Sequence, residues 1–583
     1  FTLKVASGNS FPDHQYGGIG QMRQRLLKFV IAAAMAVSVL PAASAAAELE
    51  PTLAADINPG PSSSFTYDHF EFGGKLLFGA NGGSGYDLYS FNGRKTSKVT
   101  DLSESGNMEG PYDFTALGDW IYFGNYTDAT GGELWRTDGT TTELVKDISP
   151  GEGSSWPGQF KAFGGNLYFE ASTPGAGEEL WKTDGTTTTQ VQDLYPGTTS
   201  SYPEDLTVFN DRLYFSASSA ASGNELFRTD GNTITLVQEI NPGVNGSYPS
   251  DLMIFGSRLI FSADNGTNGT ELWGTDGVTT AMLSDINPGG GNSYPDDFTS
   301  IGSKLVFSAD DGTHGSEPWV FDGVTASIIQ DLRPGGGSSS PDLGVARGND
   351  VYFEASTPAQ GSELWRTDGS SVVLVADILP GEDSSDPDDL FAFQGRVYLN
   401  AYTHETGYEL WAADTGGAQL VKDILPGTDG SNPDDWIPYQ DQLYFPANDG
   451  SHGDELWKLA PPDHAASIVI QGKSFKPSGR GVVKLKLACP SSEANGPCAG
   501  SLSLATAKAV KVKGKKRRFQ LARADFSVPA GATKKVRLKF GRSVMKLLRT
   551  NPPARLVKVT AEVEDGIGNR ATVRKNLKAK GLS

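Results

Sequence analysis

Six aspartates that open strand-like segments at regular intervals are the first residues in this chain whose type and spacing suggest chemistry. They are Asp113, Asp205, Asp251, Asp297, Asp389 and Asp435. If these segments line a central channel, six carboxylates surround its mouth, and oxygen-rich rings attract hard cations such as Ca²⁺. Aspartate also commonly accepts hydrogen bonds from backbone amides in its own turn. We favour this second role and keep Ca²⁺ as a candidate cofactor.

The acidic residue of an E-L-W signature is a second candidate for chemistry. It recurs every 46 residues, nine times, at Asp87, Glu133, Glu179, Glu225, Glu271, Glu317, Glu363, Glu409 and Glu455. A catalytic carboxylate is needed once or twice, at a set distance from its partner. A residue that is acidic in every unit is therefore predicted to be structural. The chain has no G-x-S-x-G, H-E-x-x-H or P-loop motif, so no catalytic residue is predicted.

The few histidines give little support to a metal site. His314 and His452 lie in turn-like segments, and no pair among the six histidines has the spacing of metal ligands. His404 and Glu405, in A-Y-T-H-E-T-G, are the clearest polar residues that depart from the repeat. Any catalytic role would need such non-repeating residues on one face.

A 46-residue unit must position all these residues. Residues 205–240 contain four strand-like runs, DLTVF, RLYFSA, ELFRT and ITLVQEI, separated by turn residues. Four antiparallel strands in such a unit match one propeller blade. A solenoid is the alternative architecture, but it would need altered capping repeats, which the sequence does not show.

The two ends of the repeat region favour a closed ring. Residues 51–57 match the fourth strand of a unit, whereas the last unit ends with a third strand at residues 455–459. The N-terminal strand can therefore complete the last blade and remove both open edges. We predict an all-β fold: a β-propeller of about nine four-stranded blades over residues 51–460, closed by an N-terminal strand.

The repeats resemble the ELWxxDGT repeat proteins of bacterial secreted chains. The best copies are E-L-W-R-T-D-G-T at 133–140 and E-L-W-K-T-D-G-T at 179–186, with departures at 87–89, 317–319 and 413–415. The resemblance implies export and a repeat fold, and it implies no particular reaction.

The N-terminal region has the pattern of a secretory signal peptide over residues 22–47, with a basic start, a short apolar run and small residues at the end. Residues 1–21 are then an upstream segment that is not native, with Met22 as the start. A membrane anchor is the alternative. We expect an extracellular or cell-surface protein without a transmembrane segment in the mature chain.

Residues 462–583 lack the repeat and are predicted to form an immunoglobulin-like β-sandwich. Its two cysteines, Cys489 and Cys498, are the only ones in the chain, and export favours a disulfide over two free thiols. The segment holds 27 Lys and Arg against 6 Asp and Glu, whereas residues 51–461 have a net charge of −42. This asymmetry suggests that the basic segment binds a polyanion.

The basic charge is concentrated in Lys511, Lys513, Lys515, Lys516, Arg517 and Arg518. Sparse aromatic residues argue against DNA, and no intracellular nucleic acid is expected as a partner. A cell-envelope polymer is the expected ligand. The alternatives are a solvated surface or docking onto the acidic propeller.

These patterns lead to an expectation of a monomeric, non-catalytic secreted protein. Its propeller would be a rigid platform for an extracellular protein or glycan, with the basic module as an envelope tether. The long connections of every unit share one acidic face, which is the candidate binding surface. The alternative is a secreted polysaccharide-active hydrolase or lyase with unlike polar residues clustered at the channel mouth.

Overall fold

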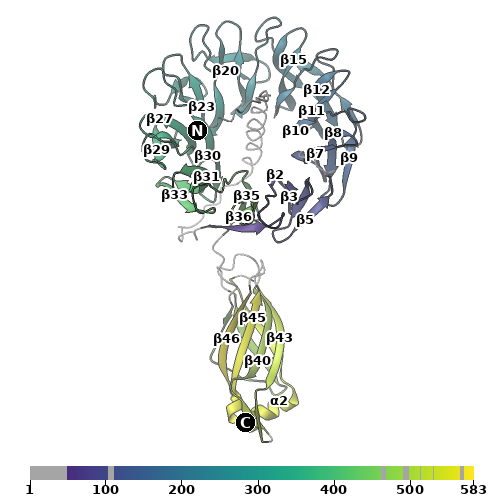
Figure 1. Ribbon diagram of the computed structural model, residues 1–583, viewed down its shortest axis with the longest axis vertical. Coiled ribbons are helices and arrows are strands. Elements are labelled where there is room, and N and C mark those ends of the chain that lie inside the picture. The colour runs from purple at the N-terminus through teal and green to yellow at the C-terminus, as the bar shows by residue number, and fades with distance from the viewer. Residues whose placement is uncertain are drawn as a thin grey trace, which may run out of the picture.

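The structure is a computed structural model and describes residues 49–102, 110–460, 468–489, 498–512, 514–529, 531–564 and 570–582. Within these ranges it contains nine four-stranded sheets arranged as a ring, followed by a separate body of strands (Figure 1). The prediction of an all-β chain with a propeller of about nine blades is confirmed.

The four strands of each blade run from the channel to the rim. The first strands are β2 (Tyr67–Phe72), β6 (Tyr112–Leu117), β10 (Gly158–Phe163), β14 (Glu204–Phe209), β18 (Ser250–Phe255), β22 (Asp296–Ile301), β26 (Asp342–Arg347), β30 (Asp388–Phe393) and β34 (Ile437–Tyr439). The second strands are β3 (Lys75–Asn81), β7 (Trp120–Thr127), β11 (Asn166–Thr173), β15 (Arg212–Ser219), β19 (Arg258–Asp264), β23 (Lys304–Asp310), β27 (Asp350–Thr357), β31 (Arg396–Thr403) and β35 (Gln442–Asn448).

The outer half of each blade contains the third and fourth strands. The third strands are β4 (Tyr86–Phe91), β8 (Gly131–Thr137), β12 (Gly177–Thr183), β16 (Gly223–Thr229), β20 (Thr270–Thr275), β24 (Ser316–Phe321), β28 (Gly361–Thr367), β32 (Gly407–Asp414) and β36 (Asp454–Ala460). The fourth strands are β5 (Thr96–Thr100), β9 (Thr142–Lys146), β13 (Thr188–Gln190), β17 (Ile234–Leu236), β21 (Thr280–Ser284), β25 (Ala326–Ile328), β29 (Val372–Ala376) and β33 (Gly417–Lys422), and in the last blade β1 (Glu50–Ala55).

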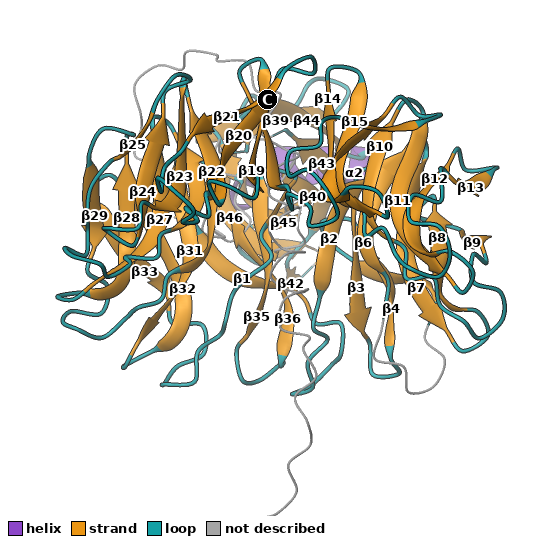
Figure 2. Ribbon diagram, turned by 90° about the horizontal axis from the view of Figure 1, so that it is seen from above, coloured by secondary structure: helices purple, strands orange, loops and turns teal. Residues whose placement is uncertain are grey.

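The first strands line the channel, because those of successive blades contact one another from β2 to β30, and β2 contacts β34. The second strands are buried along almost their whole length, as in the run Leu213–Ala217 of β15. Burial on both faces follows from packing each blade between two neighbours, and it explains why these strands are mostly apolar. Seen edge-on, the loops gather on two opposite faces of the ring (Figure 2).

The predicted closure by the N-terminal strand is confirmed. Strand β1 pairs antiparallel with β36, with Glu50 opposite Ala460 and Leu53 opposite Trp457 (Figure 1). The last blade is thereby completed by a segment from the start of the repeat region. Just after β1, the amide of Ile57 donates a hydrogen bond to the carboxylate of Glu455, 398 residues away in the chain. Pairing with β1 covers the edge of β36, so the last blade has four strands like the other eight.

The acidic residue of the E-L-W signature clamps the loop that leads to the next blade. The buried Glu133 carboxylate accepts hydrogen bonds from the amides of Ile148 (2.8 Å), Ser149 (3.1 Å) and Ser155 (3.2 Å), and from the Ser155 hydroxyl (2.7 Å). Glu225 and Glu409 make equivalent bonds in their blades. The predicted structural role of this acidic residue is confirmed.

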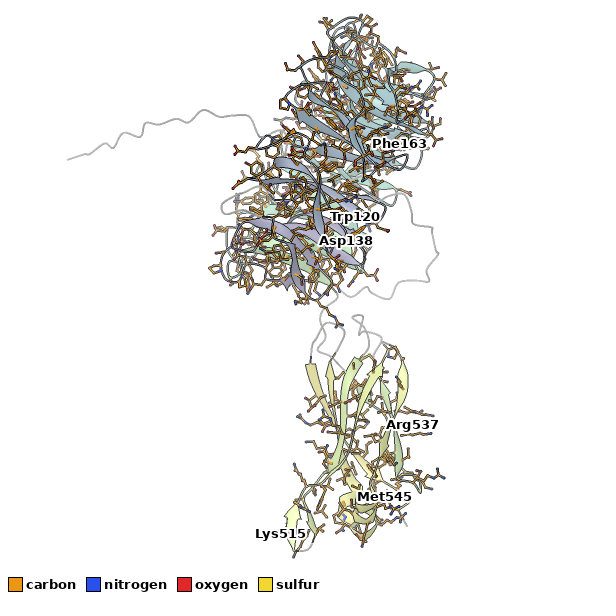
Figure 3. The ribbon with its side chains drawn as sticks, turned by 90° about the vertical axis from the view of Figure 1, so that its right-hand side faces the viewer. Trp120, Asp138, Phe163, Lys515, Arg537 and Met545 are labelled. Atoms are coloured by element: carbon orange, nitrogen blue, oxygen red, sulfur yellow. A yellow bond between two sulfur atoms is a disulfide. The ribbon has the colours of Figure 1, made fainter. Side chains whose placement is uncertain are left out.

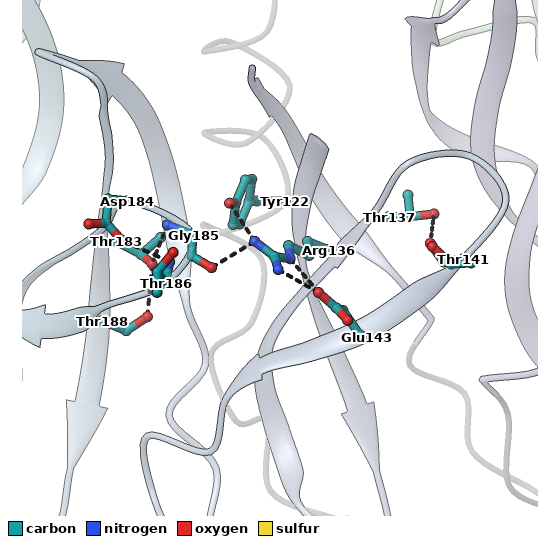
Figure 4. Close-up of polar contacts among 10 residues, drawn as sticks. All are labelled: Tyr122, Arg136, Thr137, Thr141, Glu143, Thr183, Asp184, Gly185, Thr186 and Thr188. Atoms are coloured by element: carbon teal, nitrogen blue, oxygen red, sulfur yellow. Dashed lines mark hydrogen bonds and ion pairs between the residues drawn. The ribbon is translucent and has the colours of Figure 1, made fainter. Parts of the chain in front are cut away.

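The basic residue after E-L-W holds neighbouring blades together on the opposite face. Arg136 donates a hydrogen bond of 2.7 Å to the carbonyl of Gly185 in the D-G turn of the next blade (Figure 4). Its guanidinium also bonds Glu143 and lies 4.2 Å from the centre of the Trp120 ring. Lys182 makes the same contact with the carbonyl of Gly231 one blade further on.

The C-terminal segment contains two sheets that enclose one core. The first consists of β37 (Val469–Ile470), β39 (Val482–Ala488) and β44 (Thr533–Lys539). The second consists of β38 (Ser474–Phe475), β46 (Arg570–Ala579), β45 (Leu556–Glu564), β40 (Cys498–Thr506) and β43 (Gln520–Val528). Side chains of both sheets, such as Leu485 and Leu502, lie in a single buried cluster. This is a β-sandwich, and its immunoglobulin-like type stays a prediction.

Smaller elements complete the sandwich. A helix, α2 (Arg542–Thr550), and a short 3-10 turn (Pro552–Arg555) precede β45. A separate hairpin is formed by β41 (Val510–Val512) and β42 (Lys515–Arg517). The predicted disulfide between Cys489 and Cys498 is confirmed, with a Cα–Cα distance of 5.8 Å.

Candidate functional site

An arc of exposed aromatic side chains lies at the entrance to the channel. Each stands in the segment that crosses from the rim of one blade to the first strand of the next, two residues before that strand starts. The members are Phe65, Trp156, Tyr202, Tyr248 and Tyr294, and they are 45–65% exposed. Four of them precede four consecutive blades. We call this set the aromatic crescent.

The buried glutamates of the E-L-W signature, which we call the glutamate clamps, hold the crescent in place. The backbone conformation that results has an energetic cost. The backbone amides of Ser155 and Trp156 both donate to the carbonyl of Gly132, and Ser155 is fixed by Glu133. All five aromatic residues have φ between 44° and 49°, a left-handed conformation that costs a non-glycine residue about 1–2 kcal/mol. Blades without a crescent residue share this conformation at the same position, as at Ser340 with φ of 47°, so it belongs to the repeat. Trp156 also stacks on Tyr126 at 5.9 Å.

The six predicted aspartates lie in six different blades, five of them on channel-lining strands and Asp435 just before β34. All have positive φ, from 42° to 60°. The carboxylate of Asp205 accepts a hydrogen bond of 3.0 Å from the amide of Asp251. Asp68, which occupies this position in the first blade, accepts one of 3.2 Å from Asp113. Among the six, Asp205 therefore bonds a backbone amide, but this amide belongs to the neighbouring blade and not, as we expected, to its own turn.

Calcium binding by this ring stays a prediction. Within the described residues, no three or more His, Cys, Asp or Glu side chains are grouped so as to hold a metal ion. The aspartates lie one or two blades apart, and a backbone bond between blades occupies an oxygen of Asp205. Calcium titration by calorimetry tests the prediction.

A buried histidine joins the ring where the first blade meets the last. His69 is 1% exposed, and its Nδ1 lies 2.7 Å from Oδ2 of Asp435. Its Nε2 is also buried and has no hydrogen-bond partner among the described residues. The other blades carry apolar residues at this position, such as Phe114, Leu206 and Trp436. Sequence reasoning missed His69, and its departure from that apolar pattern is the signal that could have revealed it.

Carboxyl groups beside His69 have strongly raised pKa values. Burial, with the nearby charges of Asp435 and Asp389, raises the pKa of Asp434 to about 8. Burial and the charge of Asp435 raise the pKa of Asp68 to about 7. Burial also raises the pKa of Asp454 to about 6. Near neutral pH, this side of the mouth therefore holds carboxyl groups that can donate a proton and others that can accept one.

The acidic positions around the mouth differ from blade to blade. The residue that pairs with the start of the first strand is Glu354 in one blade and Ser308 in the blade before it. Burial raises the pKa of Glu354 to about 7. Unlike polar residues thus stand at equivalent positions on this face, which is the asymmetry that a catalytic role requires.

The other histidines play local roles. His314 and His452 lie in turns, where each ring nitrogen bonds an aspartate three residues earlier, Asp311 and Asp449, at 2.7 and 2.8 Å. Their predicted role as turn residues is confirmed. His404 is exposed and lies 3.2 Å from Asp383. The structure does not bring His404 to the His69–Asp435 pair by any described contact.

The predicted polyanion-binding residues lie on the β41–β42 hairpin and just after it. Lys511, Lys515, Lys516, Arg517 and Arg518 are exposed, and Lys511 faces Lys516 across the hairpin. Lys513 lies outside the described residues, as do the predicted signal peptide at 22–47 and the upstream segment at 1–21. Among the described residues, no helix is long and apolar enough to cross a membrane.

Comparison with known proteins finds distant likenesses among solved structures. No family model and no curated protein matches the chain. A structure from a study of two prolyl endopeptidases matches at 12% identity over 75% of this chain and 56% of that one, with a TM-score of 0.37. The GH74 xyloglucanase from Xanthomonas campestris matches at 13% identity over 75% and 72%, with a TM-score of 0.32.

A solved structure that consists of a propeller domain alone gives a similar match. The β-propeller domain of the Trilobed protease from Pyrococcus furiosus matches at 9% identity over 54% of this chain and 98% of that one, with a TM-score of 0.30. The chain spans less than two thirds of the length of the first proteins it matches, for example 58% of a puromycin hydrolase. These likenesses concern the fold alone.

The comparisons correct two expectations: that the chain is not an enzyme, and that it is a non-catalytic platform with a tether. The matched proteins include peptidases and glycoside hydrolases, so a β-propeller of this kind is no sign of a non-catalytic role. The sequence reasoning considered His404 and Glu405 as non-repeating residues but missed His69. The mouth of the channel carries residues that do not recur, His69 among them.

Proposed function

We propose that the propeller is a hydrolase that binds an extended, uncharged polysaccharide across the aromatic crescent and cleaves it at the channel mouth. The observation that supports this most strongly is the contact between the buried His69 and the partly exposed Asp435, beside carboxyl groups of raised pKa in one sector of an otherwise repetitive ring. A catalytic site is needed only once in the molecule, and this group of residues occurs at one place in a scaffold of nine similar blades.

The crescent supplies the binding surface. A flat sugar ring packs its C–H face against an aromatic side chain, and Tyr and Trp combine an apolar body with a polar tip. Side chains fixed by the backbone lose little conformational freedom on binding, and the glutamate clamps fix the backbone under Trp156 and Tyr248. The net charge of −42 over residues 51–461 disfavours anionic polymers and favours an uncharged one.

Asp434 and Asp68 supply the acid and the base. Glycoside hydrolysis uses one carboxylic acid to protonate the leaving oxygen and one carboxylate to activate water or attack the sugar. Asp434, with a pKa of about 8, keeps its proton at neutral pH and is the donor. Asp68, with a pKa of about 7, is the acceptor. Asp435 lies beside both and is oriented by His69, which makes His69 a positioning residue.

We also infer that the protein works outside the cell. The Cys489–Cys498 disulfide supports this, because disulfides form and persist in oxidising compartments.

The test is release of reducing ends from a panel of uncharged polysaccharides, including xyloglucan, xylan and soluble cellulose derivatives. We expect activity on at least one of them, and a loss of 100-fold or more in Asp434→Asn, about the size of a general-acid contribution. Asp383→Asn is the matched control, because Asp383 is a well-exposed aspartate whose described partner is His404. It should keep full activity.

Binding and cleavage are separated by a second variant. Tyr248→Ala should weaken binding, seen as a higher KM, whereas Val278→Ala in an exposed D-G turn should change nothing. Binding of a polysaccharide without any cleavage would overturn the hydrolase proposal. Equal activity of Asp434→Asn and the native chain would overturn the assignment of the acid.

A further inference from the structure

The outer face of the three-stranded sheet in the sandwich carries five cations in three facing rows. In the register of β39 and β44, Lys486 is opposite Lys535, Lys484 is opposite Arg537, and Val482 is opposite Lys539. The alternate residues Val483, Leu485 and Leu487 point into the core. The five cations are therefore confined to one exposed face. We call this set the basic face.

This arrangement carries a cost that the fold does not require. Side chains directly opposite on neighbouring strands have Cβ atoms about 4.5–5.5 Å apart, and like charges there are destabilising. In the described part of the chain, the five cations have no ion pair and no side-chain hydrogen bond. None of the three strands contains an acidic residue. The described acidic residues of the sandwich, Asp525, Glu562 and Glu564, belong to the other sheet.

The basic face includes a hollow that is large enough for a ligand. A groove of about 680 Å³ is lined by Lys476, Lys484, Arg537 and Lys539, together with Ser478 and Val482. Four cations and a hydroxyl therefore converge on one concave surface. Arginine and lysine with a hydroxyl group are the donors that proteins use for phosphate oxygens.

We propose that the basic face binds a linear polymer of phosphodiesters that lacks bases, such as a poly(glycerol phosphate). Residues two apart on a strand repeat at about 6.6–6.8 Å, so the rows form two parallel lines of evenly spaced positive charge. Regular charge matches a regular polyanion. Single-stranded nucleic acid is disfavoured, because it is bound by stacking on aromatic side chains and the three strands contain none.

The basic face is separate from the hairpin that sequence reasoning singled out. Arg537 lies on the side of the sandwich with its side chain pointing away from the sheet, whereas Lys515 lies at the lower tip (Figure 3). The two surfaces carry similar charge and can be tested against each other. The proposal does not rest on the polysaccharide hydrolase, because it concerns the other domain and a different ligand.

The experiment measures binding of a fluorescent glycerol-phosphate oligomer to the full chain by anisotropy over a range of salt concentrations. Five contacts predict that log K falls with log[salt] with a slope of about −3.5. The double variant Lys484→Gln with Arg537→Gln should bind at least tenfold more weakly and show a shallower slope. The matched control, Lys515→Gln with Arg517→Gln, removes the same charge from the hairpin and should lose no more than twofold.

Three outcomes would overturn the proposal. The first is no measurable binding by the native chain. The second is equal losses in the two double variants, which would show an effect of net charge alone. The third is tighter binding of a single-stranded oligothymidylate than of the glycerol-phosphate oligomer. If the first double variant is unstable, Lys486→Gln with Lys535→Gln removes a second facing pair and repeats the test.

Discussion

Nδ1 of His69 lies 2.7 Å from Oδ2 of Asp435, although 366 residues separate them in the chain. The contact joins the first strand of the first blade to the start of the last blade, close to where the ring closes. It also fixes the orientation of a carboxyl group beside Asp68 and Asp434, the two groups to which we assign the proton transfers.

Replacing His69 separates this positioning role from a role in stability. His69→Phe installs the residue type that other blades carry at this position, and it removes a buried Nε2 without a partner. We expect a free energy of unfolding within about 1 kcal/mol of the native value, together with at least a tenfold loss of kcat. Thermal melting and reducing-end release measure the two quantities. A large loss of stability with unchanged activity would reverse the interpretation.

The raised pKa values predict a bell-shaped dependence of activity on pH. Activity should rise as Asp68 loses its proton near pH 7 and fall as Asp434 loses its proton near pH 8. In Asp434→Asn the descending limb should disappear along with most of the activity. A flat profile between pH 6 and 9 would contradict the assignment.

The same carboxyl groups predict that stability falls as pH rises. Their pKa values in the folded chain lie above the unfolded value of about 3.9. Between that pH and about 7 for Asp68, or about 8 for Asp434, the folded chain therefore holds protons that the unfolded chain releases. Unfolding then releases protons, and the melting temperature should fall from pH 5 to pH 8. Asp68→Asn with Asp434→Asn should make this slope shallower, since Asp205 and Glu354, whose pKa values are also raised to about 7, keep part of it. Asp383→Asn should leave it unchanged.

The glutamate clamp should be a major source of stability in each blade. Glu133→Ala leaves the amides of Ile148 and Ser149 without their acceptor in a buried site. We expect a loss of about 2–4 kcal/mol, measured by denaturant unfolding. Glu143→Ala, which removes an exposed partner of Arg136, should cost less than about 1 kcal/mol. Equal losses of stability in Glu133→Ala and Glu143→Ala would contradict the stabilising role of the glutamate clamp.

The link between blades should tolerate lysine but not alanine at position 136. Lys182 already makes the equivalent bond to the next D-G turn, so Arg136→Lys should preserve most of the stability. Arg136→Ala should cost about 1–2 kcal/mol through the lost bond to Gly185. The exposed Arg94→Ala serves as the control, expected within about 0.5 kcal/mol of the native chain.

The fold could be predicted from the sequence because its evidence repeats. The 46-residue period and the four runs of residues 205–240 appear in register nine times, and the unpaired runs at 51–57 and 455–459 indicate how the ring closes. Local patterns of this kind contain the information for strands and turns, and repetition removes their ambiguity. The same logic identified the acidic residue of E-L-W as structural.

The site could be predicted only in part. The face with the long connections, and the aspartates at 205 and 251, could be predicted from the sequence because these features recur. The pairing of His69 with Asp435 was not, since it depends on bringing the first and last blades together. The pKa values of Asp68 and Asp434 likewise depend on burial and on neighbours that are remote in the chain. The crescent was hidden too, because exposure of Tyr248 follows from a left-handed backbone.

Pairing of β1 with β36 has a mechanical consequence. The strands are antiparallel, and the residue at the start of β1, Glu50, is opposite the residue at the end of β36, Ala460. A force that pulls the two ends of the propeller apart therefore acts first on the hydrogen bonds next to Glu50 and Ala460. It then opens the remaining bonds of the ladder one after another. Under tension, the ring yields at this pair of strands while the other eight blades still hold their shape.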